Sequence, residues 1–151
     1  MKRSEINRSI REALDFLAEH RFLLPEWATW TPRMWGTHGE TCREIRDNAL
    51  GWDVTDFGKR NFAQEGLTLF TIRNGNPARD RKTYCEKIMF VREGQTTPIH
   101  FHWHKMEDII NRGGGDLCMK LWRADDKEGM TDAPCSFQID GITTTVRAGE
   151  V

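Results

Sequence analysis

The sequence has little net charge and no long apolar run. Its 22 Lys and Arg residues nearly balance its 23 Asp and Glu residues, leaving a formal net charge of −1 over 151 residues. Such a chain is not drawn to nucleic acid or anionic membranes, so we expect a neutral or small partner. No stretch approaches the roughly 18 consecutive apolar residues of a membrane span, and the opening MKRSEINRSIREA lacks the apolar core of a secretory signal. We therefore expect a cytoplasmic, soluble protein without a membrane partner.

Cysteine is scarce and is not arranged for chemistry. No two of the cysteines form a C-x-x-C pair, and all are widely separated: Cys42, Cys85, Cys118 and Cys135. A cytoplasmic chain keeps its thiols reduced, and this length suffices for one hydrophobic core without disulfides. We expect free thiols that mostly pack, no catalytic cysteine, and one structural domain.

The first 65 residues are predicted to form a helical and loop extension. Apolar residues recur at helical spacing from Ile6 to Leu17, which predicts an amphipathic helix over residues 4 to 20 with Ser4 as its cap. The next segment, FLLPEWATWTPRMWG, contains two prolines and three of the six tryptophans. It is expected to be an ordered loop with room for a helical turn, and a short helix is expected within GETCREIRDNALGWD.

From residue 66 onward strand patterns dominate. Alternating segments are separated by turns and by no helices, which is typical of an antiparallel sandwich or barrel. The first strand is expected to end in an Asn74-Gly75 turn, and Asp140-Gly141 is expected to join the last two strands as a hairpin turn. The predicted strands are LTLFTIRN, YCEKIMFV, TTPIHFHW, MEDIIN, DLCMKLW, CSFQI and ITTTVRAG. We therefore predict a mainly β fold, with residues 1–65 packed on a barrel formed by residues 66–151.

Three of the five histidines occupy alternate positions in PIHFHWHKMED, residues 98–108. In a strand, His100, His102 and His104 share one face, while Phe101 and Trp103 share the other. The imidazoles either lie on the outer surface or point into a barrel. Several unpaired imidazoles in an interior each cost about 1–3 kcal/mol, so an interior position calls for a metal or a hydrogen-bond network.

A carboxylate close by favours the metal. Two alternate imidazoles and one carboxylate from the next strand give two nitrogens and one oxygen with open positions, a ligand set suited to divalent-metal chemistry. Periodicity leaves open whether His102 is paired with His100 or His104, and whether Glu107 or Asp108 completes the set. The GGG at residues 113–115 permits the next tight turn.

The spacing of this segment resembles the first motif of the cupin superfamily. Gly94, five residues, His100-x-His102, four residues, Glu107, six residues and Gly114 match it at every fixed position. The resemblance implies a cupin fold, a double-stranded β-helix with a jelly-roll-like barrel. It implies that His100, His102 and Glu107 bind the metal and that His104 is a spacer.

A narrower resemblance, to the D-lyxose isomerases, covers essentially the whole chain. It is carried by MKRSEINRSIREALDFL, LPEWATWTP and TYCEKIMFVREGQTTPIHFHWHKMEDIINRGGGDL. This resemblance implies a homodimeric, manganese-dependent aldose–ketose isomerase that interconverts D-lyxose and D-xylulose, and it leaves D-mannose and D-fructose open as a second pair. It places Lys105 near the sugar, as a catalytic and substrate-binding residue.

The implied chemistry moves one hydrogen between C1 and C2 of the sugar. A divalent metal that binds O1 and O2 would polarise the carbonyl and stabilise the enediolate. Glu107, as a ligand, is a poor base, so we expect the proton-transfer base beyond Val151. A solvated lysine on a turn is the simpler alternative for Lys105.

One feature departs from the cupin pattern. The second cupin motif, which supplies a further histidine, would begin where the sequence reads RAGEV. We therefore expect that the chain stops before the last barrel strands and that the fourth ligand lies beyond Val151. His20 and His38 are expected to be surface or packing residues. Core or subunit packing, rather than stacking on a sugar, is expected of four tryptophans: Trp27, Trp30, Trp35 and Trp103.

Two other classes of function remain open. An iron-loaded site with two histidines and one glutamate would suit a dioxygenase. A non-enzymatic sugar-binding cupin would keep the pocket and need no base. Oxygen uptake, turnover and metal preference distinguish these alternatives.

Overall fold

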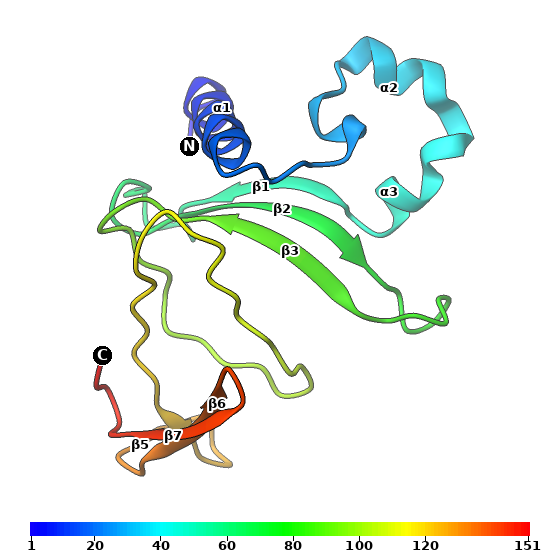
Figure 1. Ribbon diagram of the computed structural model, residues 1–151. Coiled ribbons are helices and arrows are strands. Elements are labelled where there is room, and N and C mark those ends of the chain that lie inside the picture. Colours follow the sequence, from blue (N-terminus) through cyan, green and yellow to red (C-terminus); the bar gives the residue numbers. More distant parts are fainter. The chain divides into compact units, whose positions relative to one another are not determined.

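The computed structural model describes all residues, Met1–Val151. The chain forms two compact units, Met1–Ile99 and His100–Val151, which are described separately. The structure combines N-terminal helices with antiparallel strands (Figure 1). The predicted division at residue 65 remains a prediction. The segment before it also contains a strand, β1 (Gly51–Thr55), that pairs with a strand after it.

Helix α1 (Arg3–Glu19) confirms the predicted amphipathic helix. Its most buried positions are spaced four residues apart at Ser9, Ala13 and Leu17, as one helical face requires. The predicted cap at Ser4 is wrong. Lys2 is the N-cap, and its backbone N–H donates to the Glu5 carboxylate over 2.6 Å. The Glu5 side chain therefore satisfies the amide of the residue at which the helix begins.

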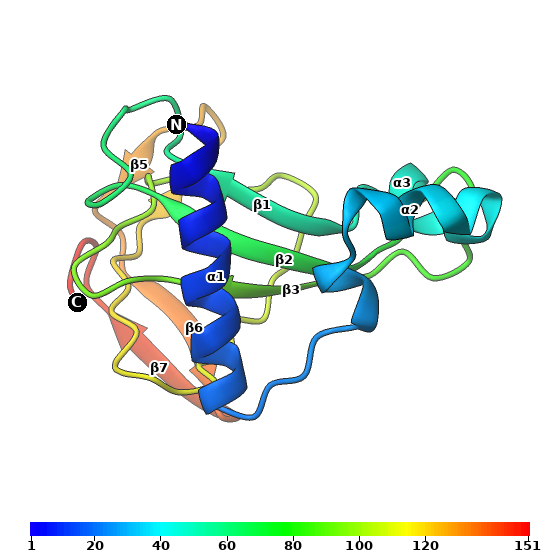
Figure 2. The same ribbon diagram turned by 90° about the horizontal axis from the view of Figure 1, so that it is seen from above.

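Helix α1 lies over a three-stranded antiparallel sheet of order β1-β2-β3 (Figure 2). The other two strands are β2 (Leu67–Asn74) and β3 (Cys85–Phe90), both as predicted. Phe70 on the central strand is completely buried. Its ring stacks on Trp27 at 4.8 Å and meets Trp52, its partner on β1, edge-on at 5.1 Å. This aromatic group forms the centre of the core.

A polar contact joins the helix to the sheet. The buried hydroxyls of Ser9 and Thr68 lie 2.8 Å apart, although they are 59 positions apart in the sequence. Arg92 Nη2 donates to Ser9 Oγ over 3.2 Å and also pairs with Glu12 on the same helix. Buried polar groups are tolerated where each has a partner, so this contact fixes the position of α1 on the sheet.

The Trp-Pro segment is more helical than predicted. It contains the 3₁₀ helix η1 (Glu26–Thr29) and the short helix α2 (Pro32–His38). Thr31 caps α2 by accepting from the backbone N–H of Met34 over 3.3 Å, and Pro32 occupies the first helical turn, where its missing N–H costs nothing. A capping threonine followed by proline is typical of a helix start. From the sequence, only an ordered loop with room for a helical turn was expected.

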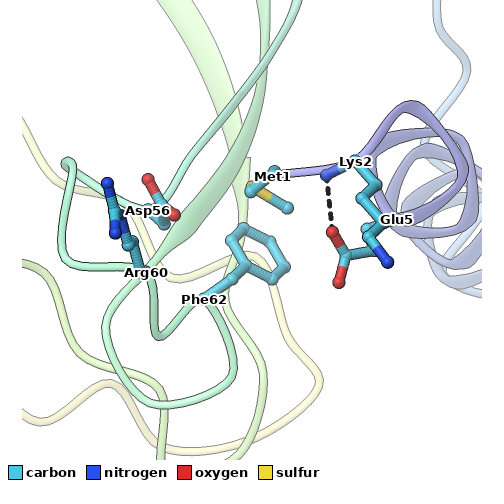
Figure 3. A pocket seen from close by; sticks show the side chains of 6 residues that line it. All are labelled: Met1, Lys2, Glu5, Asp56, Arg60 and Phe62. Atoms are coloured by element: carbon cyan, nitrogen blue, oxygen red, sulfur yellow. Dashed lines mark hydrogen bonds between the residues drawn. The ribbon is translucent and has the colours of Figure 1, made fainter.

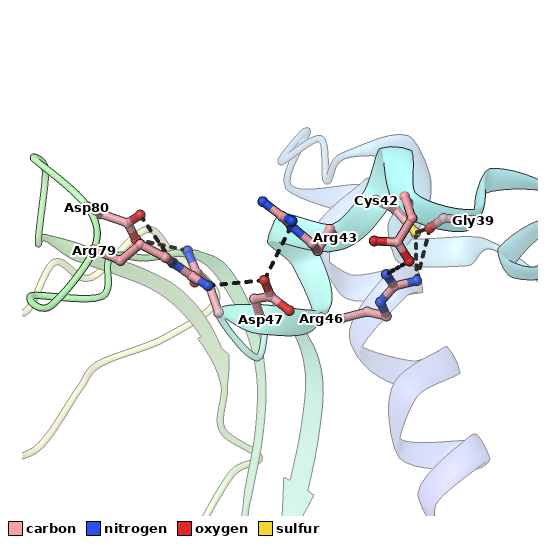
Figure 4. Close-up of polar contacts among 9 residues, drawn as sticks. Gly39, Cys42, Arg43, Arg46, Asp47, Arg79 and Asp80 are labelled. Carbon is pink, nitrogen blue, oxygen red and sulfur yellow. Dashed lines mark hydrogen bonds and ion pairs between the residues drawn. The ribbon is translucent and has the colours of Figure 1, made fainter.

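The predicted second helix is present as α3 (Arg43–Asp47), which follows the 3₁₀ turn η2 (Gly39–Cys42). Figure 4 shows that ion pairs fix both ends of this region. Arg46 bonds to the Gly39 carbonyl over 2.9 Å and to the Glu40 carboxylate over 3.0 Å. Asp47 lies between Arg43 and Arg79, at 3.6 and 3.1 Å.

The turn predicted at Asn74-Gly75 is wrong, because the turn lies at residues 77–79. Strand β2 ends at Asn74 and β3 begins at Cys85, so a loop connects them. The Asp80 carboxylate holds this loop by accepting from the backbone N–H of Asn76 over 2.7 Å and from Asn48 Nδ2 over 3.2 Å. A side-chain anchor therefore replaces the two-residue turn.

The second unit contains two hairpins. One joins β4 (Arg123–Ala124) to β5 (Met130–Thr131), and the other joins β6 (Cys135–Ile139) to β7 (Ile142–Val146). The predicted Asp140-Gly141 turn is confirmed. Both residues have positive φ, 50° and 83°, as a tight type I′ turn requires.

The strands predicted within residues 98–122 are wrong. No strand lies between β3 and β4, and the strands form three separate sheets that do not close into a barrel. Alternation alone does not make a strand, because each strand also needs a neighbour for its backbone hydrogen bonds. The apolar residues of this segment accordingly remain exposed, among them Ile99, Phe101, Ile109 and Ile110.

All four cysteines are free thiols, as predicted. Cys42 is buried and packs, whereas Cys85 and Cys118 are exposed, so the packing role predicted for them is wrong. None of the helices has both the length and the apolar character needed to cross a bilayer.

Candidate metal centre

The segment of residues 98–108 keeps its predicted alternation without being a strand. The rings of His100 and His102 lie edge to face with their centroids 5.1 Å apart. Those of Phe101 and Trp103 do the same at 4.9 Å. Alternate residues therefore pair along this segment, imidazole with imidazole and aromatic ring with aromatic ring.

The carboxylate of Glu107 faces the second of these imidazoles. Glu107 Oε2 lies 3.6 Å from His102 Nε2. Of the two carboxylates that the periodicity left open, Glu107 and Asp108, Glu107 is the one with this contact. An imidazole nitrogen and a carboxylate oxygen at this separation suit two ligands of one cation, since ligand atoms about 2.0–2.2 Å from a metal lie within about 4 Å of each other.

Lys105 contacts both groups. Its ammonium pairs with Glu107 Oε1, and Nζ lies 3.4 Å from His102 Nε2. The hydrogen bond from Lys105 is the main reason why the pKa of Glu107 is lowered from its usual value, and partial burial opposes it. The charges of Lys105, His102 and His100 lower this pKa further. Glu107 is therefore held in the ionised form that a metal ligand needs.

The site is open to solvent, which corrects the expectation of imidazoles inside a barrel. The side chains of His102, Lys105 and Glu107 are 35%, 45% and 39% exposed. Without strands on either side of this segment, nothing encloses them. The cost of burying unpaired imidazoles, which favoured a metal in the sequence interpretation, does not arise for this arrangement.

The donor types fit a divalent metal, but the arrangement is incomplete. No three His, Cys, Asp or Glu side chains surround a common point closely enough to hold an ion. Within the predicted set, His102 and Glu107 face each other, and the ring of His100 lies edge-on to that of His102. The position between His102 and Glu107 is taken by the Lys105 ammonium, a cation supplied by the chain itself.

The glycine turn after the site is confirmed. Gly113 and Gly114 have φ of 131° and 94°, values that glycine adopts without the cost that a Cβ would add. Asn111 holds the turn by accepting from the Gly113 backbone N–H over 3.1 Å and donating from Nδ2 to the Gly115 carbonyl over 2.9 Å. The turn lies shortly after Glu107 in the chain.

The two remaining histidines pack, as predicted. His20 bonds through Nδ1 to the Phe16 carbonyl over 2.9 Å and stacks on the Phe16 ring. His38 stacks on Trp30 at 3.8 Å. Both lie in the first unit, and each already has an aromatic partner. They are not replacements for a missing ligand.

Most of the tryptophans also pack, and one does not. Trp27 stacks on Phe70, and Trp30 meets Trp35 edge-on at 4.9 Å. Trp103 is 56% exposed and is not part of the core, so subunit packing stays the prediction for it. The indole N–H of Trp30 is buried and has no hydrogen-bond partner, a cost of about 1–3 kcal/mol that the surrounding aromatic contacts offset.

A pocket in the first unit does not include the predicted site. It has a volume of about 410 Å³ and is lined by Met1, Lys2, Glu5, Asp56, Arg60 and Phe62 (Figure 3). Its two basic side chains are balanced by two acidic ones, so it favours no ligand of one charge. None of the predicted metal or substrate residues contributes to it.

The contact between Lys105 and Glu107 is the feature that sequence reasoning missed. The resemblance assigned Lys105 to the sugar, and the structure places its ammonium on a predicted metal ligand. The sequence contains the relevant pattern, because a lysine two positions before a glutamate on an irregular segment can contact that glutamate. The role predicted for Lys105 was taken from the family resemblance alone.

Comparison with known proteins identifies the family. The D-lyxose isomerase family matches residues 1–151. A D-lyxose/D-mannose isomerase from Escherichia coli O157:H7 is 47% identical over 152 residues, which is 99% of this chain and 67% of that protein. One from Serratia proteamaculans is 45% identical over the same shares. The chain thus spans about two thirds of the length of these relatives, and it belongs to the D-lyxose isomerase family.

Proposed function

We propose that this protein is a metal-dependent aldose–ketose isomerase that interconverts D-lyxose and D-xylulose, with D-mannose and D-fructose as a second substrate pair. The observation that carries the proposal is the family match over every residue of the chain. Relatives named for both D-lyxose and D-mannose support the choice of sugars. The two aldoses share the geometry at C1 and C2, where the reaction occurs.

The proposed ligands are His100, His102 and Glu107, and the proposed ion is Mn²⁺. Two imidazole nitrogens and one carboxylate oxygen are donors that this ion accepts. When bound, a divalent ion supplies a Lewis acid that polarises the sugar carbonyl and stabilises the negative charge that develops in the reaction. The lowered pKa of Glu107 supports its role, because a ligating carboxylate must be ionised.

Lys105 is the proposed substrate-binding and catalytic residue. Its ammonium carries three donors on a flexible stem, and it lies within 3.4 Å of one proposed ligand. From this position it can donate a hydrogen bond to a sugar oxygen as negative charge develops there. Its partial exposure leaves the side chain free to turn toward a bound sugar.

The remaining parts of the proposal rest on the family resemblance. We propose that a cupin barrel is the fold that would enclose the site, since the spacing from Gly94 to Gly114 follows the first cupin motif. A homodimer and a cytoplasmic location stay predictions. No nucleic-acid partner is expected of a chain with a formal net charge of −1.

Sugar turnover by matched histidine variants tests the proposed function. The manganese-loaded protein should convert D-lyxose to D-xylulose without oxygen uptake. His100→Ala and His102→Ala should lower the rate by at least about a hundredfold, since even partners of ligands affect activity by 10–100-fold. His104→Ala, which removes the neighbouring spacer imidazole, should retain activity. Oxygen consumption with iron, or tight sugar binding without turnover, would instead support the dioxygenase or the binding protein.

A further inference from the structure

We propose that Lys105 is the internal counter-ion of the metal-free centre, and that a metal ion must displace its ammonium from between His102 and Glu107. This inference rests on the proposed function, because it presumes that these two residues are metal ligands. It adds a step that the proposed function does not contain. The same lysine would hold the ligands before the metal arrives and become available to the sugar only afterwards.

The contacts of the ammonium carry the inference. Lys105 Nζ pairs with Glu107 Oε1 and lies 3.4 Å from His102 Nε2, and these two ligands are themselves 3.6 Å apart. A neutral imidazole accepts a hydrogen bond through Nε2 when its proton is on Nδ1, and a carboxylate only accepts. One cation thus already contacts two of the three side chains that would donate to a metal.

Electrostatics make this arrangement exclusive. A divalent ion within about 4 Å of an ammonium is repelled by it. If both cations shared the same carboxylate and imidazole atoms, this repulsion would weaken the binding of each. Both Lys105 and His102 lie within 4 Å of the Glu107 carboxylate, and the bond from Lys105 is the chief cause of the lowered pKa of Glu107. The ammonium therefore competes directly with a metal for this carboxylate.

The exposure of the three side chains makes displacement feasible. Lys105, Glu107 and His102 are between 35% and 45% exposed, so water can take over the hydrogen bonds of a departing ammonium. An exposed ion pair of this kind is weak and its side chains are mobile. The lysine can hold the two ligands near each other and still yield to a divalent ion of higher charge.

Displacement would link metal binding to substrate binding. While the ammonium is paired with Glu107, it has fewer donors left for a sugar oxygen. Once a metal takes its place, the ammonium remains attached to the same short segment and is free to bind a ligand. The metal-loaded protein would then present a sugar-binding group that the metal-free protein keeps occupied.

The dissociation constant for Mn²⁺ tests the proposal without any sugar. It is measured at constant ionic strength for the unaltered protein and for Lys105→Gln, Lys105→Arg and Lys120→Gln. Lys120 is an exposed lysine of the same unit that forms no ion pair, so its substitution removes one charge away from the site. Lys105→Arg keeps the charge beside the ligands.

Lys105→Gln should bind Mn²⁺ about three- to fivefold more tightly, the scale of one exposed ion pair, whereas the other two variants should stay within about 1.5-fold of the unaltered protein. An unchanged or weaker affinity of a folded Lys105→Gln variant would overturn the inference and leave the proposed ligands intact. If the unaltered protein binds no Mn²⁺, both this inference and the proposed metal centre fail.

A second measurement follows the lysine itself. Magnesium, which is diamagnetic, is added to the unaltered protein while the NMR signals of the lysine Cε and Hε atoms are recorded. The Lys105 signals should shift as the ion binds, and those of Lys120 should not. Lys105 signals that stay constant through saturation would show that the ammonium is not displaced.

Discussion

His102 Nε2 and Glu107 Oε2 lie 3.6 Å apart across a short irregular segment, with the Lys105 ammonium in contact with both side chains. The pair brings together a nitrogen and an oxygen donor that no secondary structure holds in place. The Lys105 ammonium contacts both side chains and keeps them near each other. In this structure two of the proposed metal ligands are therefore joined through an ion pair with Lys105.

The first prediction distinguishes the two acidic residues that follow the histidines. Glu107→Gln should weaken Mn²⁺ binding by at least about a hundredfold, because it replaces a ligating carboxylate with a neutral amide. Asp108→Asn should leave the affinity nearly unchanged, since only Glu107 contacts His102. Isothermal titration with Mn²⁺ measures both. A larger loss of affinity for Asp108→Asn than for Glu107→Gln would show that Asp108, not Glu107, is the metal ligand.

The second prediction concerns pH. In the metal-free protein Glu107 should titrate below the usual value for glutamate, because Lys105 stabilises its ionised form. Because the pKa of Glu107 is lower in the folded state, the contact with Lys105 stabilises the fold at pH values above the ordinary glutamate pKa. This contribution is lost as the pH falls through the lowered folded-state pKa. The pair is exposed, so the effect on unfolding should be small.

Carbon-13 NMR of the glutamate carboxyl groups follows this titration directly. In Lys105→Gln the pKa of Glu107 should rise toward its usual value, and in Lys120→Gln it should remain lowered. Equal pKa values in the unaltered protein and in Lys105→Gln would contradict the ion pair.

The third prediction concerns the core of the first unit. Phe70→Ala should lower the free energy of unfolding by about 3–5 kcal/mol, because it leaves a cavity between Trp27 and Trp52. Phe101→Ala removes the same ring from a position that is 41% exposed and should cost less than about 1 kcal/mol. Urea unfolding followed by circular dichroism compares the two. Similar losses would mean that the aromatic group around Phe70 is not the core.

The fourth prediction tests the contact between helix α1 and the sheet. Thr68→Val should destabilise the protein by about 1–3 kcal/mol, because it removes the partner of the buried Ser9 hydroxyl. Ser9→Ala should have a similar effect. The double variant should cost less than the two losses added together, since no unpaired hydroxyl remains. Strict additivity in this double-mutant cycle would show that the two hydroxyls do not interact.

The elements that sequence reasoning predicted well carry their signals locally. Helix α1 has one apolar face, and the β6–β7 hairpin has Asp140-Gly141 at its turn. Strands β2 and β3 are predicted correctly because each has a neighbour to pair with. In contrast, residues 98–122 alternate as a strand does and form none, because their hydrogen-bonding partners are not supplied by adjacent sequence.

The site shows the same division. Alternation left open whether His102 pairs with His100 or with His104, and in the structure the ring of His102 meets that of His100. Spacing alone could not choose between Glu107 and Asp108, and the family resemblance made that choice. The position of the Lys105 ammonium followed from neither, because a flexible side chain is placed by the charges it meets rather than by its place in a pattern.

The central claim is that a divalent metal on this chain interconverts an aldose and its ketose. The most direct test is to treat the protein with a chelator, remove the chelator, add Mn²⁺, and follow carbon-13-labelled D-lyxose by NMR at each stage. The account predicts that D-xylulose forms in the manganese-loaded protein, not after chelation, and again after Mn²⁺ is restored. D-lyxose that stays unchanged at saturating Mn²⁺, or turnover that survives chelation, would contradict it.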